Sequence, residues 1–337
     1  MAWFPPESRA LPRITNQAPH PSLASTLMKY LFGPVNSRRL GLSQGIDLVP
    51  PKICNLNCIY CEVGATTELT CERREYIPLA ALLAEIDQLV ADREHMARLD
   101  FFTITGSGEP TLHSGLGTVI RYIRDHAAKP VAVLTNGSLL HLAEVRQELV
   151  AADVVIPSLD SAREESYRRV NRPAHCARLA DLIEGLVAFR REFSGQLWLE
   201  ILLVKGINDS DEDIAALAEA VGRIAPERVQ LNTVARPPLE GFAHPLTRQE
   251  LEAVAAQLPG RVEILVDFTS RDRETFRDPS EEAIVAMLRR RPCTAEDVSE
   301  ALGLAPAATR DTLEQLAASG RIHKTTHHDK QYYQTDR

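Results

Sequence analysis

The sequence predicts an α/β protein with a parallel sheet, followed by a small second unit, and three observations support this. Short apolar runs alternate with segments of helical periodicity between residues 45 and 266, a pattern that builds a parallel sheet covered by helices. The chain has 337 residues, 44% of them hydrophobic, which is enough for one large domain and one small one. A polar stretch, 269–279, separates the two.

The large unit contains about six strand–helix repeats, fewer than the eight of a closed barrel. The expected strands are short apolar runs at 45–50, 101–104, 131–134, 154–156, 197–204, 229–232 and 262–266. The expected helices repeat apolar residues every third or fourth position, at 78–97, 115–127, 140–151, 178–192, 210–224 and 247–258.

The two ends of the chain differ from this central part. Residues 1–27 are rich in proline and lack periodicity, so we expect a disordered extension before a folded domain at 28–268. After the linker at 269–279, the segment 280–337 is expected to form a domain of its own. Its expected elements are helices at 280–291, 294–302 and 305–319 and a hairpin over 321–333, the layout of a winged-helix domain.

Bulk composition limits the classes of function. A net charge of −8 argues against a general polyanion-binding protein. No apolar run reaches the length of a signal peptide or a membrane span, so we expect a cytoplasmic protein without a membrane partner. Six cysteines, three of them in one short loop, fit a reducing compartment better than a secreted disulfide scaffold.

Cys54, Cys58 and Cys61 are the main chemical signal of the sequence. Their C-x3-C-x2-C spacing lets three sulfurs converge, and thiolates are ligands for an iron–sulfur cluster or for zinc. A structural zinc site needs four protein ligands, and Cys71 is the only nearby fourth. Three ligands leave one metal position open for a small molecule. Cys176 and Cys293, like Cys71, are scattered in the sequence and are interpreted as buried or idle thiols.

Polar residues follow the next three strands. Gly106, Gly108 and Glu109 lie in the turn 105–110, where glycines allow close backbone approach and a carboxylate can accept from a cationic amine. Asn136 follows the third strand, and Ser158 and Asp160 follow the fourth; each can also be explained as an ordinary turn or helix cap. The carboxyl ends of parallel strands share one edge, where ligands gather.

The cysteine spacing, with Tyr60 directly before the third cysteine, and the turn 105–110 resemble the signature of the radical S-adenosylmethionine (SAM) superfamily. The resemblance implies a partial (β/α)6 barrel and a four-iron four-sulfur cluster on Cys54, Cys58 and Cys61. The fourth iron would bind the amine and carboxylate of SAM. Residues implied to contact SAM are Tyr60, Gly106, Gly108, Glu109, Asn136, Ser158 and Asp160.

The resemblance also implies an oxidoreductase that cleaves SAM reductively to a 5′-deoxyadenosyl radical, with an electron donor such as flavodoxin or ferredoxin. Residues 32–41 and 230–238 resemble the iron–sulfur oxidoreductase branch related to 4-demethylwyosine synthase. That synthase holds a second cluster on cysteines upstream of the motif, and residues 1–53 contain none. We therefore do not carry over its tRNA substrate.

The charge of the C-terminal unit indicates which class of substrate to expect. Residues 281–337 contain eight Lys and Arg against nine Asp and Glu, so few cations are available for phosphate contacts. We expect a protein or peptide substrate, with RNA modification of the wyosine type as one alternative and a redox-sensing regulator without catalysis as another. The winged helix is expected to select the partner and to contribute nothing to the cofactor chemistry.

Overall fold

The computed structural model describes residues 28–37, 39–265, 280–327 and 330–335. The expected disordered extension, 1–27, and the expected linker, 269–279, lie outside the described residues. Within the described part, no helix combines the length and the apolar character that a bilayer crossing requires.

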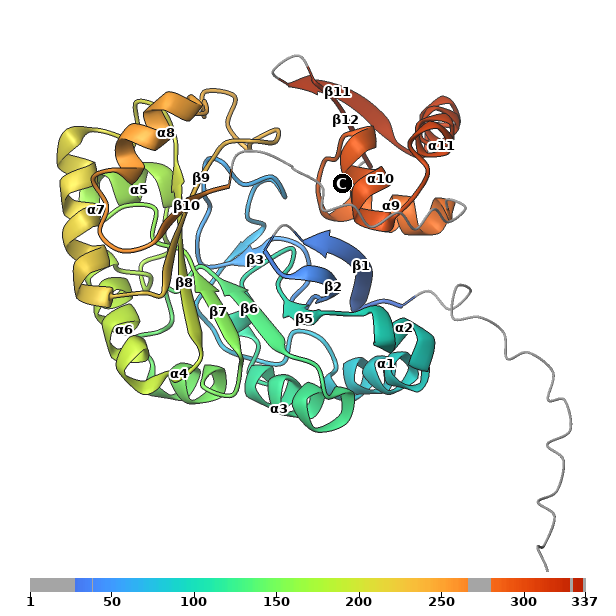
Figure 1. Cartoon of the computed structure of the whole chain (residues 1–337), viewed down its shortest axis with the longest axis horizontal. Helices are drawn as coiled ribbons and strands as arrows, with labels where there is room; N and C mark the ends of the chain where they lie inside the picture. Colours follow the sequence, from blue (N-terminus) through green and yellow to red (C-terminus); the bar gives the residue numbers. More distant parts are fainter. Residues whose placement is uncertain (1–27, 38, 266–279, 328–329, 336–337) are drawn as a thin grey trace, which may run out of the picture.

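The core of the molecule is a curved eight-stranded sheet in the order β1-β2-β5-β6-β7-β8-β9-β10 (Figure 1). Its strands are β1 (Leu31–Ser37), β2 (Gly41–Ile46), β5 (Phe101–Ile104), β6 (Val131–Thr135), β7 (Val154–Pro157), β8 (Gln196–Leu203), β9 (Arg228–Thr233) and β10 (Val262–Ile264). β1 and β2 are antiparallel, and all other neighbouring pairs are parallel. The expected α/β fold with a partial barrel is confirmed.

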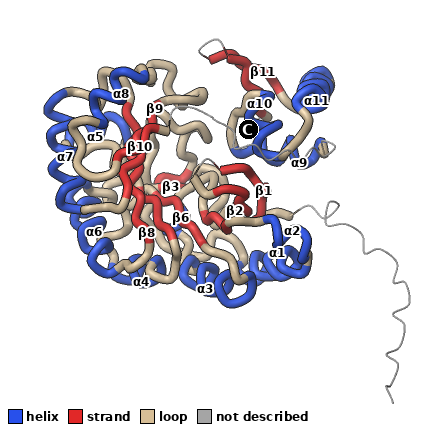
Figure 2. The backbone as a smooth tube through the Cα atoms, in the orientation of Figure 1, coloured by secondary structure: helices blue, strands red, loops and turns tan. Residues whose placement is uncertain are grey.

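Helices cover the outer face of this sheet, as the tube in Figure 2 shows. They are α1 (Leu79–Ala91), α2 (Arg93–Arg98), α3 (Leu116–Ala127), α4 (Ala143–Leu149), α5 (Glu164–Asn171), α6 (Leu179–Glu192), α7 (Asp211–Ile224) and α8 (Arg248–Ala255). Successive side chains of β8 point to opposite faces of the sheet and so contribute to two different apolar clusters. Leu199 and Ile201 are buried in the main core, whereas Trp198 points to the inner side and packs with Val154 and Ile156.

The structure differs from the sequence prediction in several elements. The first parallel strand, expected at 45–50, is β2 at Gly41–Ile46, so Pro50 lies beyond its end. Residues 31–37 form strand β1, which pairs with β2 although it contains Gly33 and Pro34; a register shift between Phe32 and Val35 accommodates them. The expected helix 78–97 divides at Asp92, whose side chain accepts from the His95 amide and begins α2. The short polar helix α5 was not expected.

The C-terminal segment contains α9 (Glu281–Arg290), α10 (Ala295–Leu302), α11 (Pro306–Ala318), β11 (His323–His327) and β12 (Lys330–Gln334). These elements enclose a separate apolar core that includes Ile284, Val298, Leu313 and Tyr333. The unit lies beside β1 (Figure 1), where the Asn36 side-chain amide donates to the Glu300 carbonyl. The helices and hairpin are those expected, and the winged-helix assignment and domain boundaries stay predictions.

The packing of β8 gives a stability prediction. Leu199 is fully buried in the main core, so Leu199→Ala should lower the free energy of unfolding by about 2–5 kcal/mol. Leu69, on β4 (Glu68–Leu69), is 49% exposed, and Leu69→Ala should change it by less than about 0.5 kcal/mol. Urea denaturation followed by circular dichroism compares the two. Equal effects would contradict the layering.

Candidate cofactor site

The cysteine loop lies at the carboxyl end of β2 and is anchored on α5. Cys54 ends the short strand β3 (Ile53–Cys54), which pairs with β4, and Cys58 and Cys61 follow in the loop. The Asn57 amide donates to the Asn171 carbonyl and the Ile59 amide to the Val170 carbonyl, each at 2.9 Å. All three cysteines are free thiols. The unexpected helix α5 therefore supports the loop.

The glycine turn packs directly against the cysteine loop. The Lys52 amide donates to the Ser107 carbonyl at 2.6 Å, and the Glu109 amide donates to the Ile53 carbonyl at 3.0 Å. A Cβ on Gly108 would lie 2.2 Å from the Ile53 oxygen, so only glycine fits there. The structure thus brings the two sequence motifs together through backbone contacts.

Each cysteine sulfur has a side-chain donor beside it. Lys52 Nζ lies 3.0 Å from Cys61 Sγ, Asn136 Nδ2 lies 3.6 Å from Cys54 Sγ, and Asn171 Nδ2 lies 3.4 Å from Cys58 Sγ. Cations and amide donors stabilise negative charge on sulfur.

Burial has the opposite effect on the thiols. Burial, and next the charge of Glu109, raise the pKa of Cys54 to about 12; burial and the charge of Asp160 raise the pKa of Cys58 above its usual value. Because metal ligation requires thiolates, the positive charge of bound metal is needed to keep these sulfurs deprotonated.

The three free cysteines fit the ligand set of an iron–sulfur cluster. No three His, Cys, Asp or Glu side chains among the described residues form a group that could hold a single metal ion. A cluster instead binds each cysteine at a separate iron, which needs more widely spaced sulfurs. The Asn171 side chain lies beside Cys58, and its oxygen is buried without a hydrogen-bond partner in the described part of the chain, which leaves one polar group there that a ligand could satisfy.

The interpretation of Cys71 and Cys176 as idle thiols is wrong. Their sulfurs are joined in a disulfide, with the Cα atoms 6.4 Å apart. Cys71 therefore is not available as a fourth zinc ligand. The pairing was not visible in the sequence because the two cysteines are 105 positions apart. Cys293 is a buried free thiol, as expected.

Glu109 is fully enclosed, with 2% of its surface exposed. Its Oε1 accepts from the Thr111 amide at 3.0 Å and the Thr135 hydroxyl at 2.6 Å, and its Oε2 accepts from the Asn136 amide at 2.7 Å. Burial raises the pKa of Glu109, and these hydrogen bonds oppose the rise. A cationic ligand would favour the charged form further.

The remaining predicted residues surround one small pocket beside the cysteine loop. Its lining residues are Leu56, Tyr60, Asn136, Ser158, Asp160, Tyr167, Asn171 and Leu182. The Tyr60 hydroxyl donates to Asp160 Oδ2 at 2.5 Å, and the Leu202 amide donates to Asp160 Oδ1 at 2.9 Å. Gly106, Gly108 and Glu109 do not line this pocket, although Glu109 reaches it through the Asn136 amide.

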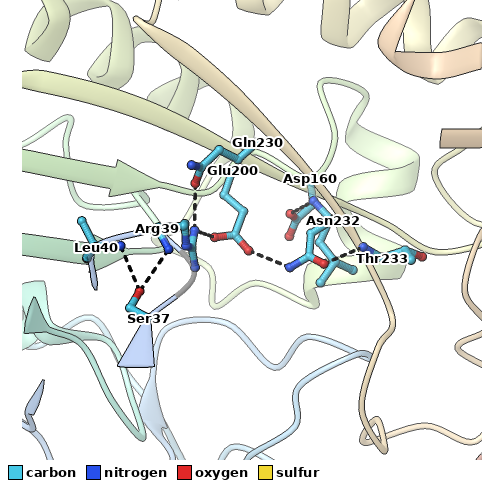
Figure 3. Close-up of polar contacts among 9 residues, drawn as sticks. Ser37, Arg39, Leu40, Asp160, Glu200, Gln230, Asn232 and Thr233 are labelled. Atoms are coloured by element: carbon cyan, nitrogen blue, oxygen red, sulfur yellow. Dashed lines mark hydrogen bonds and ion pairs between the residues drawn. The ribbon is translucent and has the colours of Figure 1, made fainter. Parts of the chain in front are cut away.

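A second polar group inside the sheet was not identified from the sequence. Arg39 Nη1 donates to Glu200 Oε2 at 2.5 Å and to Gln230 Oε1 at 3.0 Å, and Asn232 Nδ2 donates to Glu200 Oε1 at 3.2 Å (Figure 3). The side chains of Arg39 and Glu200 are 18% and 17% exposed. Glu200, a charged residue within the apolar run 197–203 of β8, was the available signal.

Lys52 and Asn171 were also missed. Lys52 is buried, adopts a positive φ of 63°, and places its ammonium group beside Cys61. Its position two residues before Cys54 was the only hint in the sequence. Asn171 approaches the site because it ends helix α5, whose short polar sequence gave no periodic signal.

Comparisons with known proteins identify the family of the chain. The sequence model of the Radical SAM superfamily matches residues 48–218. The "UPF0026 protein" of Methanocaldococcus jannaschii is 30% identical over 311 residues, which cover 91% of this chain and 96% of that protein. The "GTPase Obg" of Brachyspira hyodysenteriae is 33% identical over 92% of this chain, but the chain spans only 45% of that protein's length.

A solved structure supports the fold. A radical SAM methyltransferase from Sphaerobacter thermophilus is similar with a TM-score of 0.52 at 17% identity, over 66% of each chain. At this identity the similarity concerns the fold alone. It agrees with the partial barrel expected from the six repeats.

The close approach of Gly108 to Ile53 gives a test of the site. Gly108→Ala should force the two loops apart, cost about 1–3 kcal/mol of folding free energy and lower the iron retained after reconstitution. Gly241→Ala is the matched control, because no atom lies within 4 Å of the added methyl group. Iron analysis and urea denaturation compare them. If both variants retain as much iron as the unsubstituted protein, the close approach of Gly108 to Ile53 is not required for the site.

Proposed function

The chain belongs to the radical SAM superfamily, and we propose that it holds the four-iron four-sulfur cluster of that family on Cys54, Cys58 and Cys61. Members of the superfamily bind this cluster and SAM. We propose further that the substrate is a protein or peptide. The superfamily is enzymatic and cleaves SAM by a radical mechanism. The observation that carries the residue assignment is the pair of backbone hydrogen bonds between the cysteine loop and the glycine turn. When bound, the cluster supplies the electron that cleaves SAM to methionine and a 5′-deoxyadenosyl radical.

The chain's own residues would bind and orient the cofactors. Lys52, Asn136 and Asn171 donate toward the three cysteine sulfurs and so stabilise their negative charge. Glu109 would accept from the methionyl ammonium group, while Gly106 and Gly108 let the backbone approach the ligand.

The pocket residues would take the remaining parts of SAM. Asn136, Ser158 and Asp160 offer polar groups for the ribose and the carboxylate, and the Tyr60 hydroxyl fixes the Asp160 carboxylate. Buried apolar residues around the loop, among them Leu56 and Ile59, exclude water from the reacting groups.

The substrate proposal rests on charge. The C-terminal unit is near neutral, which favours a protein or peptide over a polyanion. The Arg39–Glu200 ion pair would offer polar groups to the substrate on the inner side of the barrel.

An electron donor such as flavodoxin or ferredoxin would reduce the cluster. RNA modification of the wyosine type and redox sensing without catalysis are the alternatives. Mass spectrometry of material that remains bound to an inactive variant separates peptide from RNA.

The cluster assignment predicts the iron content. Anaerobic reconstitution should give about four irons per chain, and a reductant with SAM should yield 5′-deoxyadenosine. Replacing Cys54, Cys58 and Cys61 together with alanine should abolish both. Cys293→Ala, at a free cysteine of the C-terminal unit, is the control and should retain the iron. Unchanged iron in the triple variant would refute the assignment.

The role of Glu109 predicts a change in SAM affinity. Glu109→Gln should weaken SAM binding by about 1.5–3 kcal/mol, the range for a hydrogen bond to a charged group, while the cluster remains loaded. Glu219→Gln, at an exposed position on α7, should leave the affinity unchanged. Calorimetric titration of the reconstituted proteins measures both. Equal affinity in the two variants would make Glu109 a structural cap of the turn.

A further inference from the structure

The C-terminal unit makes a buried contact behind the glycine turn. Arg290, the last residue of α9, donates from Nε to Asp47 Oδ2 at 2.8 Å. Its guanidinium lies over the Phe32 ring, 4.3 Å from the centroid, and donates to the Ala286 carbonyl at 2.9 Å. The side chains of Arg290 and Asp47 are 19% and 14% exposed. This ion pair is therefore largely shielded from solvent and held in one geometry.

Asp47 transmits this contact to the turn that contains Gly106. It directly follows β2, and its Oδ1 accepts from the Ser107 amide at 3.0 Å. A Cβ on Gly106 would lie 1.5 Å from the same oxygen, so the carboxylate packs against the turn itself. Burial raises the pKa of Asp47, and Arg290 opposes this by favouring the charged form.

A second set of ion pairs connects the C-terminal unit to the cysteine loop. Glu62, the residue after Cys61, accepts from Arg236 Nη1 at 3.0 Å. Arg236 Nη2 lies 3.5 Å from Asp297 Oδ1 on α10, and Arg291 Nη1 lies 3.8 Å from Glu62 Oε1. The C-terminal unit therefore contacts both loops that form the cofactor site.

We propose that Arg290 is a positioning residue for SAM: through the Asp47 carboxylate, it holds the turn at Gly106 and Ser107 in the conformation that receives the methionyl group. The inference rests on the proposed function of that turn. It departs from the expectation that the C-terminal unit contributes nothing to the cofactor chemistry. Without Arg290, Asp47 is a buried carboxylate with the Ser107 amide as its remaining donor, and burial then favours protonation or displacement of the side chain.

The test compares SAM binding by full-length reconstituted variants. Arg290→Gln should raise the dissociation constant for SAM about tenfold, because one charged contact is lost behind the binding turn. Arg290→Lys, which keeps the charge, should recover part of the affinity. Arg289→Gln is the matched control, because Arg289 is the neighbouring residue on the same helix and is exposed. Iron content should be unchanged in all three.

Steady-state kinetics distinguish a role of Arg290 in positioning SAM from a general loss of folded or active protein. For uncoupled 5′-deoxyadenosine formation, Arg290→Gln should raise the KM for SAM by the same factor and leave kcat at saturating SAM unchanged. Asp47→Asn, which keeps the acceptor for the Ser107 amide but removes the charge, should reproduce the effect.

Two results would overturn the proposal. One is an unchanged SAM dissociation constant in Arg290→Gln and Asp47→Asn. The other is loss of iron or of cooperative unfolding in both variants, which would make the contact a support of the fold. If the wild-type protein binds SAM without cleaving it, the proposed function is refuted. The SAM dissociation constants of the wild-type protein and the Arg290→Gln variant would still decide the role of Arg290.

Discussion

The cofactor site depends on the contact between the cysteine loop and the glycine turn. Strands β2 and β5 are parallel neighbours, so the segments that leave their carboxyl ends start side by side. Two backbone hydrogen bonds then join these segments, and the missing Cβ of Gly108 allows the distance. Backbone contacts of this kind are insensitive to side-chain rotation, which fixes the cysteines relative to Glu109.

The electrostatics of the site follow from burying acidic groups together. Cys54, Cys58, Glu109 and Asp160 all have pKa values raised first by burial. Their closest protein partners are mostly amides and hydroxyls, which stabilise negative charge only in part. Burial therefore disfavours negative charge on these groups, and a cationic ligand would oppose this effect.

The parallel strands from β5 to β10 and the positions at their carboxyl ends could be predicted, because apolar periodicity and parallel topology are local or general properties. Asn136 and Asp160 lie near the cysteine loop for this reason. Lys52 could not be assigned, since its contact with Cys61 arises from the fold of the loop, in which Lys52 has a positive φ. The contacts of Arg39 with Glu200 and of Arg290 with Asp47 join residues separated by 161 and 243 positions, and such pairings arise only from tertiary packing.

The Cys71–Cys176 disulfide has a consequence for the unfolded chain. It closes a loop of 105 residues and so removes conformations that the unfolded polypeptide would otherwise sample. For a loop of about this length, the chain-entropy model gives a stabilisation of about 5 kcal/mol. Part of the protein's resistance to unfolding is therefore set by the thiol–disulfide balance of its surroundings, because that balance decides whether the unfolded chain keeps this bond.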